Sequence, residues 1–465
     1  MLSYIVVIIH YWTYYYSVMN TKKLRKGKIS LVGLGKLGMS LAACFADRGF
    51  DVLGVDINKE TVRMVNAGLS PNGEYGLREL IRKNKDRLSA TTDHSLAIAE
   101  TDVTFILVAT PSDTYGNFSN KYVESATKAL AIHLKNSKKP FHIFVISSTV
   151  APTSVEKRII PLIERHSGRK LDRGFGVCYV PDFVALGTVI KNFMNPDFVM
   201  IGHTDDFSGS YIAGIYEKMC MNNPPIRKMS LVNAEVAKIA LNNYMTVKIS
   251  FGNALANLCS RIPGADVDVI TETIGIDKRI SPHYLKGGLA YGGTCFPRDV
   301  AAWVAIAKKY GVSHDLQSAI ENINEDQDAY LLSMVEQGIK RSKKKAVSIL
   351  GLSFKHGTPV VDRSPAIKLI SSLVRRGVHV TVYDPLAMEN TRKIFGSKIK
   401  YADSVKDCIS RSAVCVITTS DKEFKKLKEN YILHKPTIII DCWRIVRFCN
   451  RFKNVRHIPL GVHTP

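Results

Sequence analysis

Residues 28–38 of this chain read KISLVGLGKLG and begin a series of alternating strands and helices. Ile29–Gly33 is a short apolar run typical of a buried strand, and residues 36–48 have the pattern of a helix. The same alternation continues with a strand at Val52–Asp56, a helix at 58–67, and apolar runs at Val103–Ala109, His142–Ser148, Val177–Val180 and Phe198–Gly202. Strands that alternate with helices predict an α/β fold with a parallel, doubly wound sheet.

The glycine spacing between the first strand and helix predicts a dinucleotide site. Gly33 allows a tight turn, Gly35 lets the backbone approach a pyrophosphate, and Gly38 permits close packing of helix on strand, with Leu37 in the same turn. Asp56 ends the next strand, where it can accept a hydrogen bond from a ribose 2′-OH and repel a 2′-phosphate. These residues favour NAD over NADP, although glycines can also serve packing alone.

The rest of the chain divides into further parts. A helical pattern runs from Ser230 to about Ile262, and a helix of that length usually bridges domains and offers a dimer surface. Helices are expected at 266–275, 297–310 and 314–338, followed by a basic linker at Lys340–Lys345. A second α/β series then contains Ala346–Leu350, 364–376, Val378–Tyr383, Ala413–Thr418 and Thr437–Asp441. The predicted domains are therefore an extension (1–27), an NAD-binding Rossmann-like domain (28–228), a helical central and dimerisation domain (229–339) and an α/β domain for the substrate nucleotide (340–465).

Composition excludes several classes of protein. The 465 residues are 46% hydrophobic, which allows sizeable cores and excludes a disordered chain. The net charge of +23 suits an anionic partner or a lysine-coated surface, but no zinc pattern or aromatic-basic module supports nucleic-acid binding. Nine cysteines without paired spacing argue against a metal site and a disulfide framework, so a reducing, cytoplasmic location is expected.

The N-terminal stretch Met1–Met19 is apolar and has no charged residue before Lys22. It has the length of a membrane anchor but lacks a basic flank and a cleavage site. We favour the alternative that synthesis begins at Met19, so membrane contact is expected only if residues 1–18 form a real anchor.

Several polar residues follow predicted strands or share a helix face. Thr110 and the segment Ser147–Val150, which includes Thr149, lie at carboxyl ends of strands, where hydroxyls can reach a nicotinamide or serve as ordinary turn residues. Lys238 and Asn242 are four residues apart on the long helix and share one face. Together they can stabilise an alkoxide, but by spacing alone a solvated pair is the expected arrangement.

The segment from Tyr284 to Asp299, YLKGGLAYGGTCFPRD, is the most informative for chemistry. Its four glycines predict a backbone that wraps closely around a small ligand. Pro297 suits the first turn of a helix, which places Cys295 at the positive helix end and favours a nucleophilic thiolate. Asp299 is expected in the first turn, for charge stabilisation or proton handling.

With these segments in place, the chain from about Lys28 to Arg444 resembles the UDP-glucose/GDP-mannose dehydrogenase family of nucleotide-sugar oxidoreductases. GGTCFPRD at 292–299 is close to the family signature GGxCxxKD. The resemblance implies oxidation of a sugar C6 alcohol to a carboxylate with two NAD⁺, through a thiohemiacetal and a thioester on Cys295. UDP-glucose is the substrate we expect, with UDP-N-acetylmannosamine and GDP-mannose as alternatives.

The resemblance also assigns roles to individual residues. Lys238 and Asp299 match residues that assist alkoxide formation and deprotonate alcohol or water, Asn242 matches the oxyanion partner, and Thr149 matches a threonine that positions water beside the nicotinamide. Residues matched to substrate binding are Lys238, Asn242, Tyr284, Leu285, Lys286, Gly288, Gly292 and Lys355. Arg279 matches an arginine that reaches the neighbouring subunit's site, so the resemblance implies a homodimer.

Three positions depart from the family pattern. The family's PEFLxEG is PDFVALG at 181–187, so Asp182 replaces one glutamate as a shorter candidate base and Leu186 replaces the other. An NAD-contacting arginine aligns with Asp362, one place before Arg363. A late substrate arginine aligns with Trp443, one place before Arg444.

These departures keep other interpretations open. A simple β-hydroxyacid dehydrogenase also pairs a dinucleotide domain with a Lys/Asn helix, but needs neither the second α/β domain nor the cysteine. A catalytically silent nucleotide-sugar binding protein is the alternative outside enzymes, because Leu186 cannot do acid–base work.

Overall fold

The structure is a computed structural model that describes residues 27–427, 437–446 and 455–464. The expectations for Met1–Met19 lie outside the described residues. The chain forms two compact units: one contains the residues up to Pro111 together with Ser119–Val236, and the other contains Ser112–Phe118 and the chain from Ala237 onward. Each unit has its own sheet.

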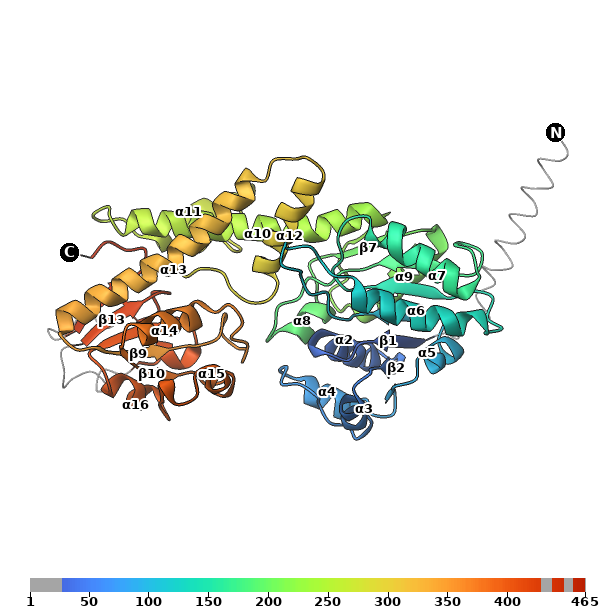
Figure 1. The fold of residues 1–465 in the computed structure, drawn as a ribbon, viewed down its shortest axis with the longest axis horizontal. Coiled ribbons are helices and arrows are strands. Elements are labelled where there is room, and N and C mark those ends of the chain that lie inside the picture. The colour runs from blue at the N-terminus through green and yellow to red at the C-terminus, as the bar shows by residue number, and fades with distance from the viewer. Residues whose placement is uncertain (1–26, 428–436, 447–454, 465) are drawn as a thin grey trace. The chain divides into compact units, whose positions relative to one another are not determined.

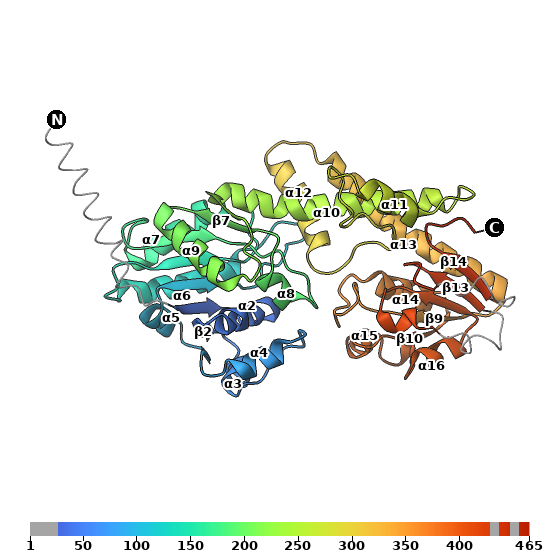
Figure 2. The same ribbon diagram turned by 180° about the vertical axis from the view of Figure 1, so that it is seen from behind.

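The first unit is built on an eight-stranded sheet with helices on both faces (Figures 1 and 2). In spatial order its strands are β3 (Leu88–Thr91), β2 (Asp51–Val55), β1 (Lys28–Val32), β4 (Val103–Ile106), β5 (Ile143–Ile146), β6 (Gly176–Tyr179), β7 (Val199–His203) and β8 (Ile226–Ser230). Its helices are α2 (Lys36–Asp47), α3 (Lys59–Asn66), α4 (Leu77–Lys83), α5 (His94–Glu100), α6 (Lys121–Lys135), η1 (Val155–Ile159), α7 (Ile160–Ser167), α8 (Val189–Met194) and α9 (Asp206–Met219).

The predicted parallel sheet is confirmed except at one pair. Strands β6 and β7 are antiparallel, with Cys178 opposite His203, whereas the other pairs of this sheet are parallel. The segment between these two strands contains α8, a helix of only six residues, and it returns the chain into the sheet in the opposite direction. The expectation of a wholly parallel sheet was therefore wrong at this point.

The second unit combines long helices with a six-stranded parallel sheet. Its helices are α10 (Leu231–Cys259, which begins in the first unit), α11 (Val267–Gly275), α12 (Phe296–Lys309), α13 (Asp315–Ser342), α14 (Pro365–Arg375), α15 (Met388–Phe395), η2 (Gly396–Lys398), α16 (Val405–Ser410) and α17 (Lys422–Lys425). The sheet order is β11 (Lys400–Tyr401), β10 (His379–Tyr383), β9 (Ala346–Leu350), β12 (Val414–Ile417), β13 (Thr437–Asp441) and β14 (Val455–Pro459). This second doubly wound sheet confirms the predicted fold class.

The predicted basic linker is shorter than expected. Helix α13 continues through Ser342 and ends at Lys343, which has a left-handed backbone with φ of 52°. Strand β9 begins at Ala346, so only three residues connect helix to strand. Lys340 and Arg341 lie in the last turn of the helix, where positive charge is favourable, so this stretch does not form a long connection.

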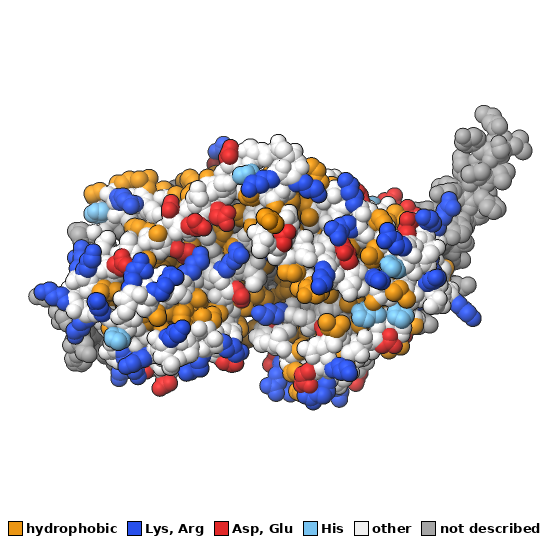
Figure 3. Space-filling view, in the orientation of Figure 1, with side chains coloured by type: hydrophobic (Ala, Val, Ile, Leu, Met, Phe, Trp, Pro, Cys, Tyr) orange, Lys and Arg blue, Asp and Glu red, His pale blue; other side chains and the backbone are white. Residues whose placement is uncertain are grey.

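The strands are buried because both faces of each sheet are covered. Phe45 of α2 packs on Phe105 of β4 with ring centroids 5.0 Å apart in the core of the first unit. Lysine and arginine side chains are spread over the face seen in Figure 3 and do not gather in one patch. Within the described ranges, no helix combines the length and the apolar character needed to cross a membrane.

Candidate functional site

The glycine turn after β1 has the geometry that its sequence predicts. Gly33 has φ of 98°, and a Cβ there would lie 2.4 Å from the Leu107 carbonyl oxygen. A Cβ on Gly38 would lie 1.8 Å from the Gly33 carbonyl oxygen. A side chain at either position would therefore push the turn apart, because real Cβ contacts are much longer.

The second glycine of the turn faces open space. A Cβ on Gly35 would meet no atom within 4 Å, and Gly35 caps α2 without a side-chain hydrogen bond from the described residues. The first N–H groups of α2 are thus available to a phosphate, together with the positive end of the helix. The Asp56 carboxylate adjoins the turn, since it accepts the N–H of Leu34 at 2.7 Å and that of Asn58 at 2.9 Å. These residues fit a dinucleotide, whereas Leu37 packs partly buried against the core.

The loops after β4 and β5 are joined by one hydroxyl. Ser148 Oγ accepts the N–H of Val108 at 2.8 Å and lies 2.7 Å from the Val108 carbonyl oxygen, to which it donates. Ser148 therefore stabilises the loop backbone, which agrees with the alternative that this segment contains ordinary turn residues. Thr149 is half-buried beside it, and Thr110 is buried.

The segment 181–188, where the family pattern has two glutamates, is held by a glutamate from elsewhere. Leu186 packs against the hydrophobic core of the first unit, and Asp182 is half-buried. Glu74 accepts the N–H groups of Gly187 at 3.0 Å and Val189 at 2.9 Å. Sequence reasoning missed Glu74, because it lies more than 110 residues away and no local pattern links it to this loop.

Lys238 and Asn242 are buried on α10, with exposed fractions of 6% and 8%. The expectation of a solvated pair was therefore wrong, since both side chains are covered by protein. Asn242 Nδ2 donates to Asp299 Oδ2 at 2.5 Å. Lys238 lies one helical turn before Asn242, on the same face.

Asp299 connects this face of α10 to the cysteine. Its side chain is 1% exposed and accepts a second hydrogen bond, from Arg298 Nε at 2.9 Å to Oδ1. The Asp299 N–H donates to the Cys295 carbonyl oxygen at 2.8 Å, which is the first turn of α12. Cys295 occupies the N-cap position and is exposed, whereas the other seven cysteines among the described residues are buried.

The glycines around the cysteine make room for protein neighbours. A Cβ would lie 2.6 Å from Ala256 Cβ at Gly287, 2.6 Å from the Trp443 ring at Gly288, 2.4 Å from the Arg363 carbonyl oxygen at Gly292, and 2.8 Å from the Phe354 ring at Gly293. We expected these glycines to leave space for a ligand. This was wrong at the positions where a Cβ would stand, because protein atoms already occupy them. Close packing inside the second unit explains them.

The remaining predicted substrate residues are spread over the second unit. Tyr284 has φ of 62° and is 49% exposed, Leu285 is buried, and the Lys286 side chain is exposed with Nζ 3.9 Å from Asp268 Oδ1. The Arg279 side chain is 87% exposed and pairs with Asp277 at 2.6 Å.

Lys355 is half-buried in the turn after β9. This turn resembles the glycine turn of the first unit: Gly351 has φ of 97°, and Asp384 after β10 accepts the N–H of Leu352 at 2.8 Å, as Asp56 does for Leu34. Sequence reasoning missed Asp384, although its place directly after a strand was a usable signal.

Arg444 is a structural residue. Its guanidinium donates to both carboxylate oxygens of Asp268 at 2.7 and 2.9 Å, to the Gly287 carbonyl at 2.7 Å and to the Leu460 carbonyl at 2.6 Å. With its side chain 6% exposed and its donors used in this way, Arg444 holds the glycine-rich segment against α11.

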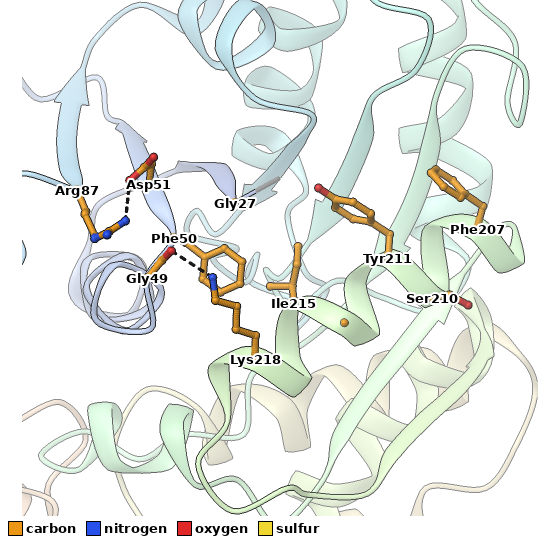
Figure 4. A pocket seen from close by; sticks show the side chains of 11 residues that line it. Gly27, Gly49, Phe50, Asp51, Arg87, Phe207, Ser210, Tyr211, Ile215 and Lys218 are labelled. Atoms are coloured by element: carbon orange, nitrogen blue, oxygen red, sulfur yellow. Dashed lines mark hydrogen bonds and ion pairs between the residues drawn. The ribbon is translucent and has the colours of Figure 1, made fainter. Parts of the chain in front are cut away.

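A cavity of about 570 Å³ lies in the first unit, away from the glycine turn (Figure 4). It is lined by Gly27, Asp51 and Arg87, which stand at the amino ends of β1, β2 and β3, and by residues of α9 such as Lys218. The glycine turn follows the carboxyl end of β1. Ligands of open α/β sheets bind at the carboxyl edge, so this cavity is not the dinucleotide site.

The glycine turn with its adjoining Asp56 fits a dinucleotide, and the comparisons with known proteins identify the first unit as the NAD-binding domain of an oxidoreductase. Domain models of the UDP-glucose/GDP-mannose dehydrogenase family match residues 27–220 (NAD binding domain), 232–326 (central domain) and 348–448 (UDP binding domain). The chain belongs to the UDP-glucose/GDP-mannose dehydrogenase family.

Individual relatives cover nearly the whole chain. UDP-glucose 6-dehydrogenase AglM of Haloferax volcanii is 36% identical over 90% of this chain and 97% of its own length. GDP-mannose 6-dehydrogenase of Pseudomonas putida is 31% identical over 86% and 92%. The solved UDP-glucose dehydrogenase of Pyrobaculum islandicum superposes with a TM-score of 0.84 at 28% identity and covers 95% of this chain and 99% of its own. These findings confirm the predicted family, the NAD cofactor and the reaction class, an NAD-dependent oxidation of nucleotide sugars.

Proposed function

We propose that this protein oxidises the C6 alcohol of UDP-glucose to the carboxylate of UDP-glucuronate. The observation that carries the proposal is an exposed Cys295 at the start of α12, one helical turn before a buried Asp299 that Asn242 binds. The choice of sugar is supported by the relative with 36% identity, whose name gives UDP-glucose as its substrate. GDP-mannose and UDP-N-acetylmannosamine are the alternative substrates, since relatives of both kinds match.

Cys295 supplies the nucleophile in this proposal. Its sulfur adds to the C6 aldehyde to give a thiohemiacetal, which holds the carbon in place between the two oxidations. NAD⁺ held at the turn of Gly33, Gly35 and Gly38 beside Asp56 would supply the hydride acceptor for both oxidations, of the alcohol and then of the thiohemiacetal. Water then attacks the resulting thioester, which releases the carboxylate and regenerates the Cys295 thiol.

The residues around the cysteine supply proton handling and charge stabilisation. Asn242 and Lys238 stabilise the tetrahedral oxygen, because an amide N–H and an ammonium in a buried setting interact strongly with developing negative charge. Asp299 takes the proton of the alcohol or of the attacking water, and its 2.5 Å bond with Asn242 orients it. We assign Thr149 to positioning the water beside the nicotinamide and Asp182 to a supporting base.

We assign one group of residues to NAD binding and another to substrate binding. Gly33, Gly35, Gly38, Asp56 and Thr110 serve NAD, for which the open space at Gly35 leaves room. Substrate binding is assigned to Tyr284, Leu285, Lys286, Gly288, Gly292 and Lys355, together with Lys238 and Asn242. Arg444 is left out of this group because its guanidinium is occupied by protein acceptors.

We also propose a homodimer formed through α10. Tyr244, Phe251 and Leu258 follow one another at intervals of seven residues and are each more than half exposed, at 56%, 54% and 54%. Apolar residues at this spacing form one helix face that a second copy of the helix can cover. Arg279, whose side chain points to solvent, is then the residue assigned to the partner's site. Sedimentation of the wild type and of Phe251→Arg tests this: a dimer that becomes monomeric supports the interface, and a wild-type monomer refutes it.

We propose a cytoplasmic location because the described cysteines are free thiols. All eight cysteines that the structure describes are free, and seven of them are buried, which suits a reducing compartment.

The test of the substrate is a panel of UDP-glucose, UDP-N-acetylmannosamine and GDP-mannose, each incubated with NAD⁺ while NADH absorbance is followed. The proposal expects UDP-glucose to have the highest kcat/KM and to yield two NADH per sugar. Faster turnover of another sugar would replace the substrate assignment. Binding of all three sugars without any NADH would favour the silent binding protein.

A further inference from the structure

Glu235 is a buried carboxylate that the proposed chemistry leaves without a role. It is the fifth residue of α10, and its side chain is 0% exposed. Its Oε2 accepts the N–H of Thr153 at 2.5 Å and its Oε1 accepts the N–H of Val155 at 2.9 Å. One side chain therefore fastens a loop that is about 80 residues away in the sequence.

The two N–H groups that Glu235 binds stand at the start of a helical segment. Val155 is the first residue of η1, and Ser154 before it makes no side-chain cap hydrogen bond. The first N–H groups of a helix have no partner within the helix, so acceptors from other side chains stabilise them. Glu235 thus caps this segment from another part of the first unit.

The loop requires stabilising contacts of this kind because the backbone of Thr153 is strained. Thr153 has φ of 70°, in the left-handed region. A β-branched residue in this region is a genuine outlier, and it persists only when the surrounding contacts fix it. The bond from the Thr153 N–H to Glu235 is one of those contacts.

The strained loop is the one that carries Thr149. At its start, Ser148 is bound to the backbone of Val108, and at its end Thr153 and Val155 are bound to Glu235. Thr149 lies between these two anchors and has a half-buried side chain. Release of either anchor would let the backbone at Thr149 shift.

We propose that Glu235 is a positioning residue, which sets the place of Thr149 by holding the loop 149–155 in its strained conformation. The inference rests on the proposed role of Thr149 in positioning water beside the nicotinamide. Misplacement of a positioned group by about 1 Å can cost on the order of a hundredfold in rate. The effect falls on the rate of chemistry, because the residues assigned to the nucleotide sugar belong to the second unit.

The test uses Glu235→Gln, which keeps the shape of the side chain but can accept only one of the two N–H groups well. We expect kcat to fall about tenfold to a hundredfold and KM for the nucleotide sugar to stay within about twofold. Thr149→Ala is made alone and together with Glu235→Gln. If Glu235 acts through Thr149, the double variant has the kcat of Thr149→Ala; a drop equal to the product of the two single effects would overturn the proposal.

A readout independent of activity separates this inference from the proposed function. Hydrogen exchange of a peptide covering 147–159 is expected to speed up in Glu235→Gln even if the substrate assignment fails. Asp205→Asn is the matched control, because Asp205 caps α9 by accepting the Ser208 N–H at 2.8 Å and does not bind this loop. Unchanged exchange in Glu235→Gln, or an equal change of this peptide in Asp205→Asn, would contradict the anchoring role.

Discussion

Replacement of Asp299 by Asn tests whether the buried carboxylate next to Cys295 does chemistry or only supports the fold. In the wild type, Asp299 accepts hydrogen bonds from Asn242 at 2.5 Å and from Arg298 at 2.9 Å while only 1% of its side chain is exposed. The amide keeps the shape of the carboxylate but removes its charge. Hydrogen bonds to charged groups contribute about 1.5–3 kcal/mol each, so we expect the free energy of unfolding to fall by about 3 kcal/mol as both weaken.

The expected loss of rate for Asp299→Asn is larger than this loss of stability accounts for. A positioned general base contributes about 10²–10⁴-fold, so kcat is expected to fall by at least a hundredfold under conditions in which the variant is fully folded. NADH absorbance gives kcat, and urea denaturation gives the free energy of unfolding. The two together separate an unfolded enzyme from an inactive one.

Asp102→Asn provides the matched control for this experiment. Asp102 is also buried and pairs with Lys139 at 2.9 Å, but it lies at the amino end of β4, away from the glycine turn. We expect it to lose stability while kcat stays within about threefold, because buried ion pairs are costly to break wherever they lie. If Asp299→Asn kept kcat within the same threefold range, Asp299 would be a structural residue and our assignment of a base would be wrong.

Three further predictions concern single residues. Iodoacetamide is expected to alkylate Cys295 before the buried cysteines of the described ranges and to abolish NADH formation. A fully active enzyme that carries this adduct would contradict the assignment of Cys295 as the nucleophile. Burial, the largest cause, and the charge of Glu156 raise the pKa of Glu235 to about 7 from its ordinary 4.5, against the hydrogen bonds from the backbone. The stability that this raised pKa contributes is present below about pH 4.5 and is lost as the pH rises to about 7, by about 3 kcal/mol. The wild type should therefore lose stability relative to Glu235→Gln over this range, and parallel curves of unfolding free energy against pH would refute the shift. Gly35→Ala should fold normally and weaken NAD binding, which calorimetry measures; unchanged NAD affinity would contradict the site. Gly38→Ala, whose Cβ would lie 1.8 Å from a carbonyl oxygen, should instead lower the unfolding free energy by about 1–3 kcal/mol, which urea titration measures.

Features encoded by neighbouring residues could be predicted from the sequence. The turn at Gly33–Gly38 depends on glycines within six residues, and its tight contacts were expected from that spacing. The position of Cys295 at the start of α12 followed from Pro297, which suits a first helical turn. Local chain geometry decides such features, so the pattern is sufficient.

Features that depend on distant segments could not be predicted. Glu235 and Glu74 act on loops about 80 and more than 110 residues away, and a single sequence carries no sign of either pairing. The burial of Lys238 was missed for the same reason, since helical spacing shows which residues share a face but not what covers it. The antiparallel β6–β7 pair was missed because a strand pattern carries no direction.

The glycine-rich segments could not be assigned to a ligand or to packing from the sequence alone. The absence of a Cβ serves a ligand and a neighbouring protein group equally well, and the sequence does not distinguish them. At Gly35 the space is open, whereas at Gly288 the Trp443 ring occupies it. Only the coordinates of the neighbours separate the two cases.

In the proposed mechanism the sulfur of Cys295 carries the sugar through the second oxidation. Counting the NADH formed per UDP-glucose consumed, for the wild type and for Cys295→Ala, tests this role. We predict two NADH per sugar consumed for the wild type. For the variant we predict either one NADH, with the carbon left as the aldehyde, or no consumption of the sugar. Two NADH per sugar and full conversion to the acid by Cys295→Ala would contradict the covalent mechanism.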